Sequence, residues 1–486
     1  MNKKHRISQL ICLTLAALML PSCGKTGSGT TNDDSTSAPV STTPEETELT
    51  DNLPERDMEG FELGIHHFDE TWLTWAYNIL DAETENGDLV NDAVYQRNRR
   101  IEERFNCNIT VTGQKTINVS DIQSEVMAGD SNYDVWFSYD IWTLGAAQYL
   151  MDWNELPYVD LSQQWWNPLA TEVFSVGGKQ LAAAGDFSLS TLSRASGYSF
   201  NKEIYNNLAL DYDIYQLARD GKWTIDVFAK TAKAAYSDLN GDANMDDNDR
   251  YGISGSWKEF CNRLILGSGI SYISKDADGY PIFDLPGNEN AINKIIKLYD
   301  TFMQTEIYRG QISTDVDGTG GTGDFKSGGV LFTVDNLMGL ESKRSLEIDI
   351  GFMPCPKYDE EQEHYYAPAF GAEISVLLKT LPEERWENVG ILLEALAFDS
   401  NQNLIPTYKE VVLKTKSARD DESSDMIDII INSMSFEFGL NAWQDVAANP
   451  FVRQTFAAGN PNFASTLASM ENTVNNEIEK LKTTLE

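Results

Sequence analysis

Hydrophobic and polar residues follow two patterns in the body of the chain, one typical of buried strands and one of amphipathic helices. Short apolar runs at 61–67, 109–113 and 133–138 have the length and composition of buried strands. Between them, apolar residues recur at helical spacing over 89–105 and 119–127. The pattern predicts a β-α-β-α-β start to an open, parallel α/β sheet, and such sheets bind ligands at the carboxyl ends of their strands.

The N-terminal residues predict export. Lys3, Lys4 and Arg6 precede an apolar run over 7–20, which is too short for a normal membrane span. The run ends in Leu-Pro-Ser-Cys-Gly around Cys23, which resembles the lipobox of bacterial lipoproteins. The resemblance implies a signal peptide that is removed before Cys23 and a lipid, such as palmitate, on this residue. The alternative is a plain secretory signal that contains a cysteine.

The segment that follows the signal has a different composition. Residues 24–57 are mostly Ser, Thr, Gly, Pro and acidic residues, with few large apolar side chains. Such a segment buries too little apolar surface to offset its ordering entropy. We therefore predict a flexible tether, which holds the body of the protein above a membrane.

The composition limits which classes of partner and which cysteine chemistry we expect. The 486 residues are 41% hydrophobic and 23% charged, which indicates a globular chain of two or three domains. A net charge of -38 disfavours nucleic acid as a partner. Cys107, Cys261 and Cys355 make neither a disulfide framework nor a zinc spacing, so we expect small buried residues with one bridge at most.

Four segments carry a more specific resemblance. They are GYSFNKEIY at 197–205, KWTIDVF at 222–228, DFKSGGVLF at 324–332 and GFMPCPK at 351–357, and Thr224 is the expected N-cap of a helix. In this order and spacing they resemble the family 1 extracellular solute-binding proteins, the receptors of ABC importers. The chain departs from the family pattern at Gly329-Val330 and at Cys355.

The resemblance implies an α/β fold that is two-lobed and periplasmic-binding-protein-like (type II), a clamshell with hinge crossovers. We expect the crossings near 190–196, near 367–373 and near Pro406. The expected parts are a signal peptide at 1–22, a tether at 23–57, lobe one at 58–190 plus 371–403, and lobe two at 191–370 plus 404–486.

The resemblance also implies a function. The implied protein is a monomeric receptor that is anchored by lipid to the outer face of the bacterial cytoplasmic membrane. It is not expected to be an enzyme. The receptor binds a sugar between its lobes and delivers it to the transmembrane subunits of an ABC permease. Aromatic faces stack on sugar rings, and carboxylates, amides and guanidinium groups satisfy the hydroxyls. The candidate ligand residues are Trp72, Tyr139, Asp140, Trp142, Arg194, Trp257, Glu259, Asp335 and Asn336.

Each candidate has an alternative explanation as core packing or ordinary surface. Trp165 and Trp166 are left out because adjacent tryptophans more often form one buried and one partly exposed side chain. Two other functions remain open: a glycan-processing enzyme with paired carboxylates, and an adhesin for intact polysaccharide. A non-sugar solute such as a peptide also remains open.

One acidic loop predicts calcium. Between 238 and 249, oxygen-bearing side chains stand at loop positions 1, 3, 5, 9 and 12, as in an EF-hand, with Ala243 in place of the usual glycine. A bound Ca2+ would be structural, and the alternative is a solvated acidic turn. The candidate ligands are Asp238, Asn240, Asp242, Asn244, Asp246 and Asp249.

Overall fold

The computed structural model contains one compact unit from Thr50 to the C-terminus that carries the whole fold described below. No helix in the described part of the chain is both long and apolar enough to cross a membrane. The residues described are 49–69, 79–115, 117, 119–129, 132–138, 147–246, 248–305, 307–310, 322–343, 346–417 and 420–485.

The first sheet confirms the predicted β-α-β-α-β start. Its strand order is β14-β3-β1-β2, with β1 parallel to both β2 and β3, and β14 antiparallel to β3. The elements are β1 (Phe61–Phe68), α1 (Leu89–Phe105), β2 (Cys107–Gln114), α2 (Val119–Ala128), β3 (Val135–Ser138) and β14 (Ile374–Val376).

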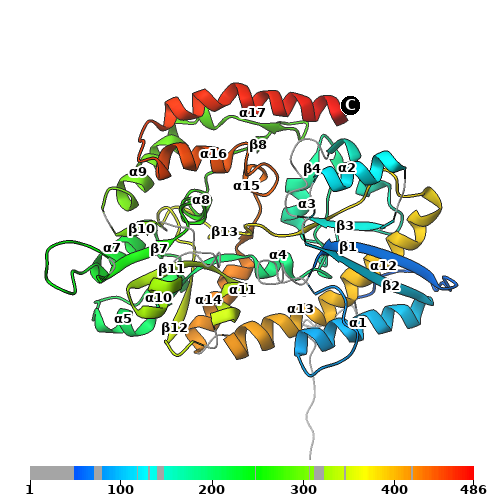
Figure 1. Ribbon diagram of the computed structural model, residues 1–486, viewed down its shortest axis with the longest axis horizontal. Coiled ribbons are helices and arrows are strands. Elements are labelled where there is room, and N and C mark those ends of the chain that lie inside the picture. Colours follow the sequence, from blue (N-terminus) through cyan, green and yellow to red (C-terminus); the bar gives the residue numbers. More distant parts are fainter. Residues whose placement is uncertain are drawn as a thin grey trace, which may run out of the picture. The chain divides into compact units, whose positions relative to one another are not determined.

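Helix α1 has local signals at both ends as well as a periodic apolar face. Asp88 caps its first turn by accepting hydrogen bonds from the backbone N–H groups of Val90 and Asn91. Asn106 ends it in a left-handed conformation with φ 49°. The buried face packs on β2 and on α12 (Glu383–Gln402), and Figure 1 shows these two helices beside the first sheet.

The second sheet is mixed. Its order is β10-β7-β11-β6-β12, in which β6 is antiparallel to both neighbours and β7 is parallel to β10 and β11. Helix α7 packs on this sheet, and Thr224 caps it as predicted. The elements are β6 (Ser196–Asn201), α7 (Ile225–Ala235), β7 (Tyr251–Gly255), α8 (Trp257–Gly267), α9 (Glu289–Phe302), β10 (Tyr308–Gly310), β11 (Val330–Asn336), α11 (Leu337–Ser342) and β12 (Ile350–Pro354).

The remaining elements connect and cover the sheets. The last helix, red in Figure 1, contacts α9 and α16 as well as the short turn at Ala147–Tyr149. These elements are η2 (Ala147–Tyr149), η3 (Trp153–Glu155), α3 (Pro168–Phe174), β4 (Ser175–Val176), β5 (Lys179–Gln180), α4 (Ser190–Ser193), α5 (Lys202–Asn207), α6 (Ile214–Arg219), β8 (Ser274–Lys275), β9 (Pro281–Ile282), η4 (Leu285–Gly287), α10 (Thr322–Ser327), β13 (Ala367–Pro368), α13 (Leu404–Pro406), η6 (Thr407–Ser417), α14 (Asp421–Asn432), β15 (Met434–Ser435), α15 (Phe438–Asn441), α16 (Ala448–Val452), η7 (Arg453–Ala457) and α17 (Phe463–Leu485).

The chain passes between the two sheets at α4 and again between β12 and β14. These passing segments bond to each other, because Ala195 forms a β-bridge with Ala369 and the Ser196 hydroxyl donates to the carbonyl of Pro368. A third passage lies between α12, which packs on β1, and α14, which packs on β12. The limits of the two lobes stay a prediction.

The core corrects one expectation and confirms another. Trp165 and Trp166 are both buried, so the expectation that one is partly exposed is wrong. The cause is Glu394 of α12, whose two carboxylate oxygens each accept an indole N–H at 2.8 Å. The three cysteines of this part of the chain are buried and free, as expected.

Candidate functional site

Four of the predicted ligand residues lie outside the described residues. Trp72 follows β1 in the chain, and Tyr139, Asp140 and Trp142 follow β3. Because β1 and β3 are parallel neighbours, both strands end at the same edge of the first sheet. Cys23 lies outside the described residues as well.

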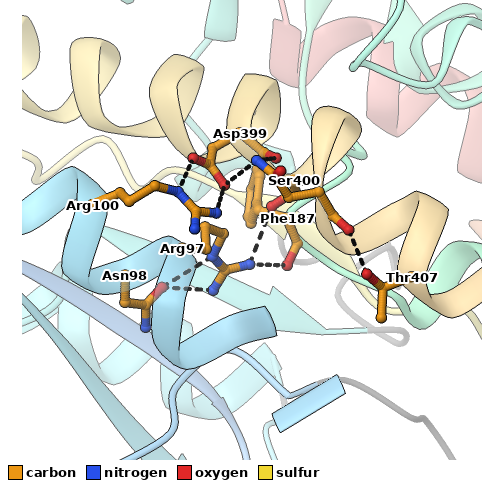
Figure 2. A network of polar contacts seen from close by, with 8 residues as sticks. Arg97, Asn98, Arg100, Phe187, Asp399, Ser400 and Thr407 are labelled. Atoms are coloured by element: carbon orange, nitrogen blue, oxygen red, sulfur yellow. Dashed lines mark hydrogen bonds and ion pairs between the residues drawn. The ribbon is translucent and has the colours of Figure 1, made fainter. Parts of the chain in front are cut away.

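Arg97 of α1 lies at the centre of a polar network, which Figure 2 shows. Its guanidinium donates to the carbonyls of Leu80, at 2.8 Å, and Phe187, at 3.0 Å, and to the Ser400 hydroxyl at 3.3 Å. It also donates twice to the amide oxygen of Asn98. Burial lowers the pKa of Arg97 to about 10. The network joins α1 and α12 to the segment that leads into α4.

The second sheet brings the other candidates together. Trp257 and Glu259 lie in the first turn of α8, and Asp335 and Asn336 lie at the end of β11. Arg263, one turn further along α8, donates to the Glu259 carboxylate at 3.1 Å and to the backbone carbonyl of Asp335 at 3.2 Å. The Arg263 guanidinium therefore connects the first turn of α8, with Trp257 and Glu259, to the end of β11, with Asp335 and Asn336.

Asp335 is more deeply buried than the sequence indicates. Only 5% of the residue is exposed, and its carboxylate accepts from the Lys343 ammonium at 2.9 Å and from the Ser199 hydroxyl. Its other oxygen accepts from the backbone N–H of Asn336 at 2.9 Å. A Cβ on Gly339 would lie 1.8 Å from this oxygen, so only glycine fits beside it. Asp335 thus fixes the start of α11, and a direct contact with a ligand stays a prediction.

Asn336 and Arg194 lie close to the passing segments. The Asn336 side chain caps α11 by accepting from the backbone N–H of Gly339 at 2.8 Å. Arg194 follows α4 and donates from Nε to the carbonyl of Gly371 at 3.3 Å. Gly371 has φ 69°, and a Cβ there would lie 2.9 Å from a guanidinium nitrogen of Arg194. Arg194 therefore packs directly on the second passing segment.

Sequence reasoning missed three residues of this cluster: Arg263, Lys343 and Ser199. The pair Glu259–Arg263 has the i, i+4 spacing of a helical ion pair, and this signal was available in the sequence. No comparable signal joins Lys343 or Ser199 to Asp335, because one pair depends on helix α11, which follows β11, and the other on the pairing of β6 with β11.

The acidic loop at 238–249 uses its carboxylates on its own backbone. Asp238 accepts from the N–H groups of Gly241 and Ala243, and Asp249 accepts from those of Leu239 and Asp246. Ala243 has φ 65°, the left-handed conformation that glycine adopts at this position of calcium loops. Among the residues described, which leave out Asp247, no group of three His, Cys, Asp or Glu side chains is placed to hold a metal ion. Calcium stays a prediction.

Comparison with solved structures identifies the fold. The galacto-N-biose-/lacto-N-biose I-binding protein of an ABC transporter from Bifidobacterium longum matches with a TM-score of 0.56 and 14% identity, over 88% of this chain and 99% of that protein. The maltose/maltodextrin-binding domain MalE from Bdellovibrio bacteriovorus, bound to maltotriose, matches with a TM-score of 0.51 and 15% identity, over 86% and 100%. The chain has the two-lobed fold of the sugar-binding proteins of ABC transporters.

A third solved structure, of a protein of the family that the sequence resembles, has the same fold. A family 1 extracellular solute-binding protein from Bifidobacterium longum subsp. infantis matches the chain with a TM-score of 0.53 and 11% identity, over 86% of this chain and 99% of that protein. The predicted type II periplasmic-binding-protein-like fold is therefore confirmed. No family model matches the sequence, and no curated protein matches it. In the solute-binding-protein fold, the cluster around Arg263 lies beside the segments that pass between the lobes.

Proposed function

We propose that the protein is an extracellular solute-binding protein that binds a sugar or oligosaccharide and delivers it to an ABC permease. The observation that carries this proposal is the cluster at the start of α8 and the end of β11, which lies next to the passing segments in a solute-binding-protein fold. Leu337 at the start of α11 donates its backbone N–H to the carbonyl of Ala195 in the first passing segment, at 3.2 Å. A ligand on this cluster therefore contacts the part of lobe two that is bonded to the hinge.

The chemistry of the cluster suits a sugar. Trp257 is partly exposed in the first turn of α8, and its indole face supplies a stacking surface. The Glu259 side chain is 34% exposed and accepts hydrogen bonds, as ligand hydroxyls require. The proposed lobe one residues Trp72, Tyr139, Asp140 and Trp142 supply the opposite wall. In this proposal Cys23 carries the lipid, and the monomer stays at the outer face of the cytoplasmic membrane. The tether is the part of residues 23–57 that precedes the compact unit, because that unit begins at Thr50 and Arg56 pairs with Glu387.

A thermal-shift screen against mono- and oligosaccharides tests the function. A ligand that binds only the folded state raises the melting temperature, and we expect maltotriose or another oligosaccharide to do so without being hydrolysed. Trp257→Ala is expected to weaken binding about tenfold or more, because the stacking surface is lost. Tyr158→Ala is the matched control, since this aromatic residue is 44% exposed and lies outside the cluster.

The same screen separates the other functions. Hydrolysis of a glycan would identify an enzyme, and stabilisation by peptides alone would identify a different solute class. Binding of intact polysaccharide without binding of short sugars would indicate an adhesin. Each of these results would contradict the proposed receptor.

We also propose that the loop at 238–249 binds a structural calcium ion. Calcium is expected to raise the melting temperature by about 2 °C or more over the protein in chelator. Asp249→Asn should remove this shift, because the twelfth loop position usually supplies a principal carboxylate. Asp278→Asn, in another acidic turn, is the control and should keep it. No shift at ~10 mM calcium, which is above the weakest affinities of such loops, would contradict the proposal.

A further inference from the structure

We propose that Arg263 is a positioning residue of the ligand site, which holds Glu259 ready to accept a hydroxyl of the bound sugar. This inference rests on the proposed function. Arg263 is 2% exposed and lies behind Glu259, one turn further along α8. Its Nη1 donates to Oε2 of Glu259 at 3.1 Å, so the guanidinium holds the carboxylate from the protein side.

The contact leaves one carboxylate oxygen of Glu259 for the ligand. Oε2 is engaged by Arg263, whereas Oε1 accepts no hydrogen bond from any residue in the described part of the chain. The Glu259 side chain is 34% exposed, so the carboxylate is partly accessible to a ligand. A carboxylate that is fixed through one oxygen and free at the other loses less side-chain entropy when it accepts a ligand hydroxyl.

Arg263 is itself fixed by the second sheet. Its Nη2 donates to the backbone carbonyl of Asp335 at 3.2 Å, at the end of β11. The Asp335 carboxylate is held in turn by Lys343 and by Ser199 of the neighbouring strand β6. The support for Glu259 therefore runs through Arg263 to the end of β11, which β6 and the residue after α11 hold in place.

Packing alone does not account for this arginine. Its Nε is buried and finds no acceptor among the residues that the structure describes. A buried donor without a partner lowers stability, a cost that an apolar side chain of similar size would not incur. The guanidinium is retained at a cost to stability, which is the pattern expected of a residue that serves the site.

A double-mutant cycle on Glu259 and Arg263 tests the proposal. Titration calorimetry would compare the wild type, Glu259→Gln, Arg263→Met and the double variant, with maltotriose or, if it does not bind, the oligosaccharide with the largest thermal shift. Arg263→Met is expected to weaken affinity about tenfold in the wild type. In the Glu259→Gln background it should cost almost nothing further. Equal losses in both backgrounds, or no loss, would overturn the positioning role.

The variant Arg263→Lys and a measurement on the unliganded protein separate a loss of positioning from a loss of folding. Arg263→Lys retains the charge but not the two-pronged geometry, so it should fold and recover only part of the affinity. Hydrogen exchange in the unliganded protein should become faster over residues 257–263 in Arg263→Met and stay unchanged in the rest of the second sheet. If no sugar binds the wild type, the proposed function fails, while unchanged exchange over 257–263 would separately overturn the role of Arg263.

Discussion

Replacing Arg97 by Met is expected to lower the free energy of unfolding by about 3–5 kcal/mol. The substitution leaves the carbonyl of Phe187 and the amide oxygen of Asn98 without the arginine donor, and the carbonyl of Leu80 with the Asn98 amide alone, in a site where only 1% of the arginine is exposed. Methionine fills part of the volume but donates no hydrogen bond. Equilibrium unfolding in urea, followed by circular dichroism, measures the loss.

The matched control for this prediction is Arg99→Met on the same helix. Arg99 has a side chain that is 48% exposed and pairs with Glu102 one turn away. The Glu102 side chain is only 10% exposed, but it keeps its hydrogen bond from the Ile109 N–H when Arg99 is replaced, so the control should unfold within about 1 kcal/mol of the wild type. Equal stability of the Arg97 and Arg99 variants would show that the hydrogen bonds of Arg97 in Figure 2 do not stabilise the folded protein.

Glu394→Gln is expected to cost about 2–4 kcal/mol, because it places an amide donor opposite one of two buried indole donors. Trp165 and Trp166 each donate to a different oxygen of the Glu394 carboxylate, and the residue is 1% exposed. Burial raises the pKa of Glu394, although the hydrogen bonds from both indoles and from the backbone of Asp160 oppose that shift. Urea unfolding followed by tryptophan fluorescence measures both the stability and the altered indole environment.

Glu387→Gln in the same helix gives the comparison. The Glu387 side chain is 48% exposed and pairs with Arg56 at 2.7 Å, so its replacement should change stability by less than about 1 kcal/mol. A Glu394 variant as stable as the Glu387 variant would mean that the indole groups find other acceptors.

Local signals in the sequence were enough for the first three strands of the first sheet and the two helices between them. The prediction of a wholly parallel sheet is wrong, because β14 joins from a distant part of the chain and pairs antiparallel to β3. The bounds of α1 were predicted to the residue, because an Asp cap, a periodic apolar face and an Asn that adopts the left-handed conformation are all local features. Strand β2 begins two residues earlier than predicted, since its start is set by pairing with β1 from Phe61 and Cys107 onward. The order of strands in the second sheet depends on long-range pairing and was not predicted.

In the candidate site, too, local contacts leave a signal in the sequence and long-range contacts do not. Glu259 and Asp335 were proposed from the family resemblance, but Arg263, which contacts both, was not, although its i, i+4 spacing to Glu259 is a local signal. Its other contact, to the carbonyl of Asp335, joins residues 72 positions apart. The exposure of the Trp165–Trp166 pair was predicted wrongly for the same reason, since the acceptor of the Trp165 indole lies 229 positions further along the chain. Contacts of this range are fixed by the tertiary fold and leave no local pattern.

The three buried cysteines have a practical consequence. Burial raises the pKa of Cys107 and of Cys355 to about 12 and also raises that of Cys261, so none of these thiols is a reactive thiolate at neutral pH. In the protein from residue 58 onward, where these three are the native cysteines, a single cysteine introduced on the surface would therefore take a maleimide dye selectively. A pair of such dyes, one on each side of the passing segments, turns the protein into an optical reporter of its own ligand.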